Sequence, residues 1–233
     1  MTRRHEAVFF DAQGTLLQAH PSVVDLYWNA CRLCNHDVDP AAIGAALKEL
    51  WSEQKRDAEG QAVCDTSDEV TRQWWDNFNT RLFHRLGMRR GRQLFVSALW
   101  DIFGRPENWR TFPEVDEVLA ELQRRGYRLG VVSNWDSRLL PICDHLRITD
   151  RVEFVIASAS VGVEKPDPRI FQIALSRARV SPDRAIHVGD DFEADFVGAR
   201  RAGIEAVLLD RDGSHPPERG GIASLRELLD MLQ

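Results

Sequence analysis

The most informative stretch of this chain is Ala7-Val8-Phe9-Phe10-Asp11-Ala12-Gln13-Gly14-Thr15-Leu16. Four apolar residues lead directly to Asp11, and a glycine turn follows. This order predicts a buried parallel strand whose carboxyl end presents a carboxylate to a crevice, which is where α/β sheets bind their ligands. We therefore expect the chemistry of this protein to involve Asp11.

A second strand of the same kind occurs far along the chain. The run Ala185-Ile186-His187-Val188-Gly189 ends in Asp190 and Asp191, and Asp195 follows shortly after. Because parallel strands end at the same edge of a sheet, we expect the two acidic clusters to meet. Lys165 lies between them in sequence, and the combination suits a metal-assisted site for a phosphate.

Further short apolar runs predict the rest of the sheet. They cover residues 129–132, 154–157 and 206–209. Helical patterns separate them over 113–125, from 167 onward, over 192–201 and over 224–232. This alternation implies right-handed crossovers and a parallel α/β sheet with helices on both faces. Strand alternation directs His187 into the sheet, so we expect it to be a core residue.

Residues 17–110 follow a different pattern. Amphipathic helical stretches cover 23–34, 41–51, 70–86 and 93–103, and no strand-like run interrupts them. We therefore predict an α/β core formed by 1–16 and 111–233, with an all-helical domain of residues 17–110 inserted after the first strand. The polar segment 213–221 is rich in proline and glycine and predicts a mobile surface loop.

Composition and charge argue against some classes of partner and cellular location. The 233-residue chain carries a net charge of −6, which does not favour a nucleic-acid partner. No apolar run approaches the roughly 20 residues of a membrane span, and the apolar run near the N-terminus is too short for a signal peptide. We expect a cytoplasmic protein without a membrane partner; its oligomeric state stays open.

Four cysteines are present, at positions 31, 34, 64 and 143. Cys31-x-x-Cys34 could indicate redox or zinc chemistry, but no second pair lies at ligand spacing and the segment has a helical pattern. We expect ordinary reduced thiols.

Four motifs, taken in their order along the chain, resemble those of the haloacid dehalogenase superfamily of hydrolases. They are Phe10-Asp11-Ala12-Gln13-Gly14-Thr15-Leu16, Val132-Ser133-Asn134, the segment Lys165-Pro166-Asp167-Pro168-Arg169-Ile170-Phe171, and Gly189-Asp190-Asp191 with Asp195. The resemblance spans the whole chain and implies a Rossmann-like core with a helical cap. Arg72-Gln73-Trp74-Trp75 further resembles the haloacid-dehalogenase-like hydrolase domain-containing subgroup.

The resemblance implies a site for a small phosphorylated substrate. Asp11 is expected to attack phosphorus and form an aspartyl-phosphate, and Lys165 to neutralise Asp11 and the phosphoryl oxygens. Mg²⁺ is the expected cofactor, because it relieves the repulsion between a carboxylate and a phosphate dianion. Its expected ligands are Asp11, Asp190 and the main-chain carbonyl of Gln13.

The remaining motif residues are expected to support these groups. Asp195 is expected to orient metal-bound water, and Asp191 either ligates the metal or takes that supporting role. Thr15, Ser133 and Asn134 are expected to donate hydrogen bonds to the phosphate or to the loop that holds it. Trp74 and Trp75 are expected in the core of the cap, or otherwise as a wall over the pocket.

Gln13 departs from the superfamily pattern. Phosphatases of this superfamily carry an aspartate two residues after the nucleophile, which protonates the leaving group and then activates water. An amide does neither, and loss of general acid–base catalysis typically costs about 10²–10⁴-fold. The sequence therefore favours a Mg²⁺-dependent phosphohydrolase with weakened acid–base catalysis.

Three alternatives remain. One is a phosphate-ligand binding protein on the same fold. A metal-independent 2-haloacid dehalogenase shares the Asp-Ala-x-Gly-Thr form, but the acidic set Asp190, Asp191 and Asp195 argues against it. A phosphonate hydrolase needs a cap lysine to form an imine, for which Lys48 and Lys55 are the candidates.

Overall fold

The computed structural model describes residues 4–58, 66–215 and 221–232. These fall into two compact units. The core unit contains residues 4–18, 66–67, 111–215 and 221–232, and the helical unit contains residues 19–58 and 68–110. Cys64, and residues 216–220 of the predicted loop, lie outside the described residues.

The core unit contains a five-stranded parallel sheet, as predicted. Its strands are β1 (Ala7–Phe10), β4 (Arg128–Ser133), β5 (Phe154–Ala157), β6 (Ala185–Gly189) and β7 (Glu205–Leu208), in the order β5-β4-β1-β6-β7. The central strand β1 is wholly buried, and Phe10 is in register with Val131 and Val188 on its neighbours. The first motif therefore starts from the most protected strand of the sheet.

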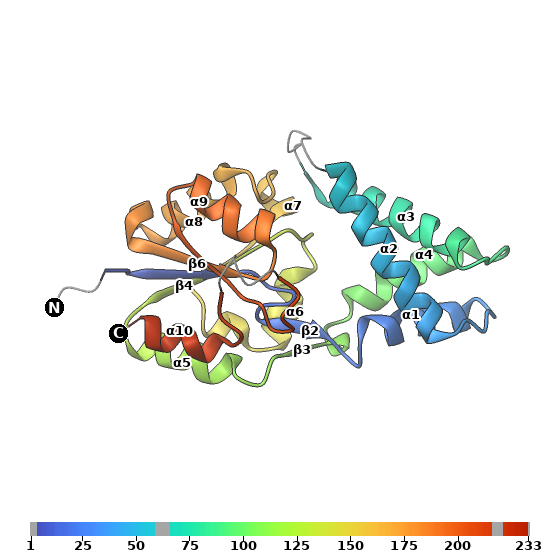
Figure 1. The fold of residues 1–233 in the computed structure, drawn as a ribbon, viewed down its shortest axis with the longest axis horizontal. Coiled ribbons are helices and arrows are strands. Elements are labelled where there is room, and N and C mark those ends of the chain that lie inside the picture. The colour runs from blue at the N-terminus through green and yellow to red at the C-terminus, as the bar shows by residue number, and fades with distance from the viewer. Residues whose placement is uncertain (1–3, 59–65, 216–220, 233) are drawn as a thin grey trace. The chain divides into compact units, whose positions relative to one another are not determined.

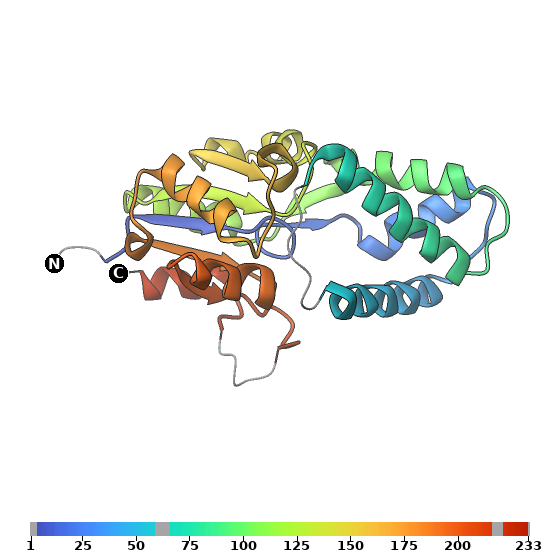
Figure 2. The same cartoon turned by 90° about the horizontal axis from the view of Figure 1, so that it is seen from above.

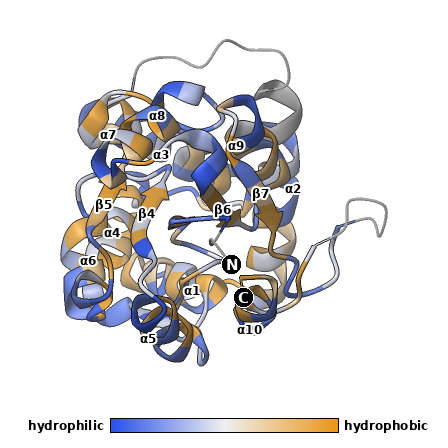
Figure 3. Ribbon diagram, turned by 90° about the vertical axis from the view of Figure 1, so that its left-hand side faces the viewer, coloured by the Kyte–Doolittle hydropathy of each residue, from blue (hydrophilic) through white to orange (hydrophobic). Residues whose placement is uncertain are grey.

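Helices cover both faces of this sheet. Figure 1 shows α8 (Pro168–Ala178) and α9 (Gly198–Arg201) on one face, and α5 (Val115–Arg124) and α10 (Leu225–Met231) on the other. Figure 3 shows β5 and β7 largely in the hydrophobic colour between these layers. Shorter elements complete the unit: α6 (Leu139–His145), α7 (Ser158–Val161), η2 (Ile148–Asp150) and η3 (Pro182–Arg184). The predicted α/β fold class is confirmed.

The segment predicted as a regular helix over 192–201 has two parts. A π-helical turn, η4 (Phe192–Val197), precedes the short α9. Both the Asp195 amide and the Phe196 amide donate to the carbonyl of Asp191, at 2.9 and 3.3 Å. Such π-turns occur frequently at functional sites, and this one contains Asp195.

The helical unit consists of four helices that lie side by side. They are α1 (Val23–Leu33), α2 (Pro40–Ala58), α3 (Asp68–Arg85) and α4 (Arg92–Gly104) (Figure 2). Trp74 and Trp75 on α3 pack with Trp51 of α2 and with Phe78, at ring-centroid distances of 4.9–5.9 Å. These tryptophans thus belong to an aromatic cluster of the unit, although Trp74 is 37% exposed.

Two short strands correct the expectation that no strand occurs between residues 17 and 110. β2 (Leu17–Ala19) and β3 (Trp109–Thr111) form a two-stranded sheet, and η1 (Pro106–Asn108) leads into β3. Strands of three residues are too short to produce a detectable alternation, so the sequence did not indicate them. The chain passes between the two units within these two strands.

The described cysteines Cys31, Cys34 and Cys143 are free and buried. Burial raises the pKa of Cys31 to about 11 and that of Cys143 to about 12, so these groups are protonated thiols at neutral pH. Among the helices in the described parts of the chain, we find none with the length and hydropathy needed to cross a lipid bilayer.

Candidate active site

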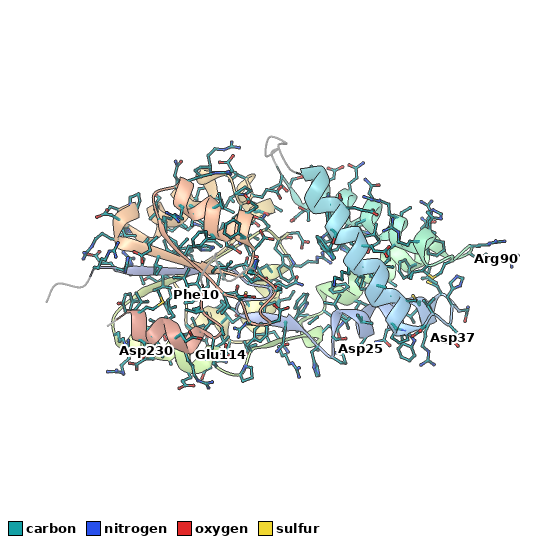
Figure 4. All side chains as sticks on the ribbon, in the orientation of Figure 1. Phe10, Asp25, Asp37, Arg90, Glu114 and Asp230 are labelled. Carbon is teal, nitrogen blue, oxygen red and sulfur yellow. The ribbon has the colours of Figure 1, made fainter. Side chains whose placement is uncertain are left out.

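Three aspartates from the first and fourth motifs converge at the carboxyl edge of the sheet. One carboxylate oxygen each of Asp11, Asp190 and Asp195 lies within 4.8 Å of the others. Asp11 follows β1, whose last residue, Phe10, is labelled in Figure 4, and Asp190 follows the adjacent strand β6. The pairing of these two strands is what brings together segments that are far apart in the sequence.

The turn after Asp11 lies directly against Asp190. Gly14 has φ +82°, and a Cβ atom added to it would lie 2.4 Å from Oδ2 of Asp190. Glycine is therefore required here both for its left-handed backbone and for the close approach. Next to it, the hydroxyl of Thr15 donates to Oδ1 of Asp190 at 3.1 Å. The turn and Asp190 are thus held in one fixed arrangement.

Lys165 is the cation of this cluster. Its Nζ donates to Oδ1 of Asp11 and to Oδ1 of Asp195, both at 2.6 Å, and the residue is 4% exposed. The side chain of Asn134 fixes the lysine backbone: its amide donates to the Lys165 carbonyl at 2.8 Å and its oxygen accepts from the Lys165 amide at 2.7 Å. Asn134 therefore orients the loop that carries the lysine.

Asp195 has hydrogen-bond partners on both oxygens. Besides Lys165, Oδ1 contacts Nε2 of His187 at 2.9 Å, and Oδ2 accepts from the Asp191 amide at 3.1 Å. The carboxylate packs on the face of Gly189, where a Cβ atom would lie 2.1 Å from its Cγ. Asp195 thus acts as an internal anchor for Lys165 and for the start of the π-turn.

The three carboxylates differ in their pKa values. Burial alone would raise the pKa of Asp195, but Lys165 and His187 hold it well below the ordinary value. Burial raises the pKa of Asp11, with Asp195 adding to the effect and Lys165 opposing it. Burial, together with the charges of Asp11 and Asp195, raises the pKa of Asp190 to about 7.

Lys165 stays charged in this environment. Burial by itself would lower its pKa, but the charges of Asp11 and Asp195 together raise it above the ordinary value. Three carboxylates therefore share one ammonium group, and Asp190 has no cationic hydrogen-bond partner among the contacts of the described residues. This excess negative charge, with hard oxygen donors, fits a divalent cation between Asp11 and Asp190.

Other residues of the predicted site occupy distinct positions. Gln13 is exposed, and its backbone forms an isolated bridge with Leu17. Ser133 is buried, and its side chain lowers the pKa of Asp11, which favours the charged carboxylate. Oδ1 of Asp191 accepts from the amides of Glu193 and Ala194, so this side chain caps the π-turn.

Comparison with known proteins identifies the family. A family profile described as haloacid dehalogenase-like hydrolase matches residues 5–203. The chain belongs to this hydrolase family. It is also 31% identical over 203 residues to haloacid dehalogenase-like hydrolase domain-containing protein 3 of Bos taurus, covering 86% of this chain and 80% of that protein. The subgroup resemblance suggested by residues 72–75 is thereby confirmed.

Relatives with a named phosphatase activity match about half of this hydrolase. The chain is 38% identical over 109 residues to glyceraldehyde 3-phosphate phosphatase of Methanothermobacter thermautotrophicus, covering 44% of this chain and 46% of that protein. Among solved structures, a haloacid dehalogenase-type hydrolase of Bacillus subtilis superposes with a TM-score of 0.77 at 19% identity, covering 99% of both chains. The latter shows a shared fold.

Two residues in the site of this hydrolase were not found by sequence reasoning. His187 is fully buried as expected, yet its ring contacts Asp195. The signal was available, because His187 and Gly189 lie on the same face of β6 and Asp195 covers that face. Arg211, three residues after β7 ends at Leu208, contacts the turn after Asp11. It belongs to no motif, so only the tertiary structure could reveal it.

Proposed function

We propose that this hydrolase cleaves a small phosphate ester with the help of Mg²⁺ and through an aspartyl-phosphate on Asp11. The observation that carries the proposal is the cluster of three carboxylates in the described part of the chain, Asp11, Asp190 and Asp195, in which the Lys165 ammonium bonds Asp11 and Asp195 but not Asp190. Relatives named as phosphatases support the substrate class. Asp11, Asp190 and the carbonyl of Gln13 would hold the cation, because both oxygens of Asp195 already have partners.

In the first step, a carboxylate oxygen of Asp11 attacks phosphorus, and the bond from phosphorus to the ester oxygen breaks. Lys165 stays protonated and stabilises charge on the Asp11 carboxyl and on the phosphoryl oxygens. When bound, Mg²⁺ neutralises the phosphate and reduces its repulsion of the nucleophile. In the second step, water attacks phosphorus and the bond between phosphorus and the Asp11 oxygen breaks, which releases phosphate.

Proton transfer is the weak point of this site. The leaving oxygen needs a proton, and the attacking water must lose one, but the amide of Gln13 serves as neither acid nor base. We therefore propose that aryl and acyl phosphates, whose leaving groups need no protonation, react best. Slow hydrolysis of the aspartyl-phosphate then limits turnover.

The helical unit would serve as the cap that selects the substrate. This role and a cytoplasmic location stay predictions. Lys48, the described lysine of this unit, is exposed on α2, and the side chain of Lys55 lies outside the described residues.

A panel of aryl, acyl and alkyl phosphates, assayed with and without Mg²⁺, tests the function. We expect Mg²⁺-dependent release of phosphate by the natural protein and none by Asp11→Asn. Tight binding of phosphate esters without turnover would instead indicate a binding protein. Metal-free release of halide from a 2-haloacid would indicate a dehalogenase, and cleavage of a phosphonate with loss on Lys48→Ala would indicate the imine route.

A further inference from the structure

Arg211 contacts the nucleophile turn from a loop that the four motifs do not include. Its Nε donates to the carbonyl of Gly14 at 3.0 Å, and its Nη2 donates to the carbonyl of Thr15 at 2.8 Å. A guanidinium group presents its N–H groups in a rigid planar fork, so one side chain fixes two consecutive carbonyls in a single orientation. The ammonium group of a lysine lacks this geometry.

The guanidinium of Arg211 is itself held from two further sides. Its Nη1 donates to Oε1 of Glu114 at 2.5 Å, and Glu114, labelled in Figure 4, is only 5% exposed. Its Cζ atom lies 3.8 Å from the centroid of the Phe112 ring. Although burial opposes ionisation of Glu114, its bond to Arg211 lowers the pKa of this carboxyl, so the pair is charged at neutral pH.

The turn that Arg211 holds carries three parts of the site. Asp11 precedes it, the carbonyl of Gln13 lies within it, and Thr15 donates from it to Asp190. The backbone of Gly14 also lies against the carboxylate of Asp190, where an added Cβ atom would lie 2.4 Å from Oδ2. The loop that carries Arg211 also contacts Asp190 directly, since Nε2 of His215 lies 3.0 Å from the Asp190 carbonyl. A shift of the turn therefore displaces the cation ligands relative to one another.

We propose that Arg211 is a positioning residue that holds the turn of residues 12–17 so that the Gln13 carbonyl and the carboxylates of Asp11 and Asp190 converge on the cation. This inference rests on the proposed function for its catalytic consequence. Its structural part, the immobilisation of the turn, is measurable in the metal-free protein.

The first experiment titrates Mg²⁺ into the full-length protein and follows the melting temperature. Residues that orient metal ligands typically contribute about 10–100-fold to metal affinity, and we expect a half-saturating Mg²⁺ concentration raised by this factor in Arg211→Met. Arg211→Lys keeps the positive charge but lacks the planar guanidinium group. It should still lose at least half of the Mg²⁺ affinity that Arg211→Met loses, on a logarithmic scale. The matched control is Arg226→Met, which removes an exposed arginine of α10 that pairs with Glu117 of α5. This variant should titrate with Mg²⁺ like the natural protein.

Two further readouts separate positioning from general loss of stability. Hydrogen exchange of the Leu16 and Leu17 amides, which donate to the Ala12 carbonyl, should accelerate in metal-free Arg211→Met but not in Arg226→Met. Added guanidinium ion should restore part of the Mg²⁺ affinity of Arg211→Met, whereas sodium chloride at the same concentration should not.

The outcomes distinguish this inference from the proposed function. If the natural protein responds to Mg²⁺ and the two Arg211 variants titrate like it, the positioning role is wrong and the proposed function stands. If the natural protein shows no Mg²⁺ response, the proposed function is wrong, and the amide exchange still decides whether Arg211 holds the turn. Equal losses in Arg211→Met and Arg226→Met would overturn the positioning role.

Discussion

The candidate active site has two sides that differ in how their charges are paired. On the lysine side, formed by Lys165, Asp195 and His187, every charge has a partner, and the pKa of Asp195 lies below its ordinary value. On the proposed metal side, formed by Asp190 and Thr15, Asp190 accepts a hydrogen bond from the Thr15 hydroxyl, and burial raises its pKa to about 7. Asp11 lies between them.

This difference shows which carboxylates are internal and which await a ligand. A buried carboxylate that contacts both a lysine and a histidine, as Asp195 does, has its charge balanced within the protein and serves to orient the lysine. A buried carboxylate without a cation costs free energy until a ligand supplies the charge. The difference therefore assigns Asp195 to the scaffold and Asp190 to the proposed metal site.

The largest effect should follow removal of the lysine side. Lys165→Met leaves Asp11 and Asp195 buried without their cation, and breaking a buried ion pair in this way costs about 3–5 kcal/mol. Urea denaturation should show this loss in the free energy of unfolding, together with loss of turnover. The control is Arg128→Met, which removes an exposed partner of Glu153 and should cost at most about 1 kcal/mol. Equal losses in the free energy of unfolding of the two variants would mean that Asp11 and Asp195 do not need the charge of Lys165.

The next largest effect should come from restoring an acid two residues after Asp11. Gln13→Asp supplies the carboxyl group that protonates the leaving oxygen, and turnover of alkyl phosphates should rise by about 10²–10⁴-fold at most. Gln13→Asn changes the length without adding an acid and should give no gain. Steady-state kinetics on an alkyl and an aryl phosphate checks the prediction, since the aryl ester should gain least. Absence of any gain, with Mg²⁺ bound, would favour a binding protein.

A smaller effect should accompany loss of the proposed ligand itself. Mg²⁺ at about 100 times its Kd stabilises a native protein by about 2.7 kcal/mol, and Asp190→Asn should abolish this increment in thermal unfolding. Asp191→Asn is a close control, because asparagine can still cap the π-turn through its side-chain oxygen, and this variant should leave the Mg²⁺ increment intact. An Mg²⁺ increment that survives in Asp190→Asn would place the cation elsewhere.

The smallest effect concerns pH. In the metal-free protein the pKa of Asp190 exceeds its ordinary value of 3.8, so the folded state holds an extra proton between about pH 4 and 7. This contribution to stability is present at low pH and is lost as the pH rises through about 7. Because the proton competes with Mg²⁺, the half-saturating Mg²⁺ concentration should fall about tenfold per pH unit up to about pH 7 and then level off. A flat Mg²⁺ affinity from about pH 5 to 8 would show that Asp190 is already ionised.

Sequence reasoning succeeded where a local pattern reports a local structure. The apolar runs that precede Asp11 and Asp190 predicted β1 and β6, because a buried parallel strand needs apolar residues on both faces. The glycine after Asp11 indicated a tight turn, and Gly14 has the positive φ that such a turn uses. The parallel topology then predicted that the two acidic strand ends would meet.

The errors arose where local pattern is weak. β2 and β3 have three residues each, too few for an alternation to show. The segment after Asp191 has helical composition, but the π-turn reflects the anchoring of Asp195 on Gly189, which no composition records. Nothing in the local sequence distinguishes Arg211 from other loop arginines, and its contacts with Gly14 and Thr15 are visible only in the folded protein.

The family, the sheet and the identity of the charged groups at its edge were predictable from the amino-acid sequence, because these depend on residue types and their spacing along the chain. How the charges are paired became visible only in the folded protein. Whether a buried carboxylate is neutralised depends on which cation lies within hydrogen-bond distance, and Lys165 reaches Asp11 and Asp195, each at 2.6 Å, but forms no bond with Asp190 among the contacts of the described residues. Electrostatic interaction depends on separation in space, and the spacing of residues along a chain does not record that separation.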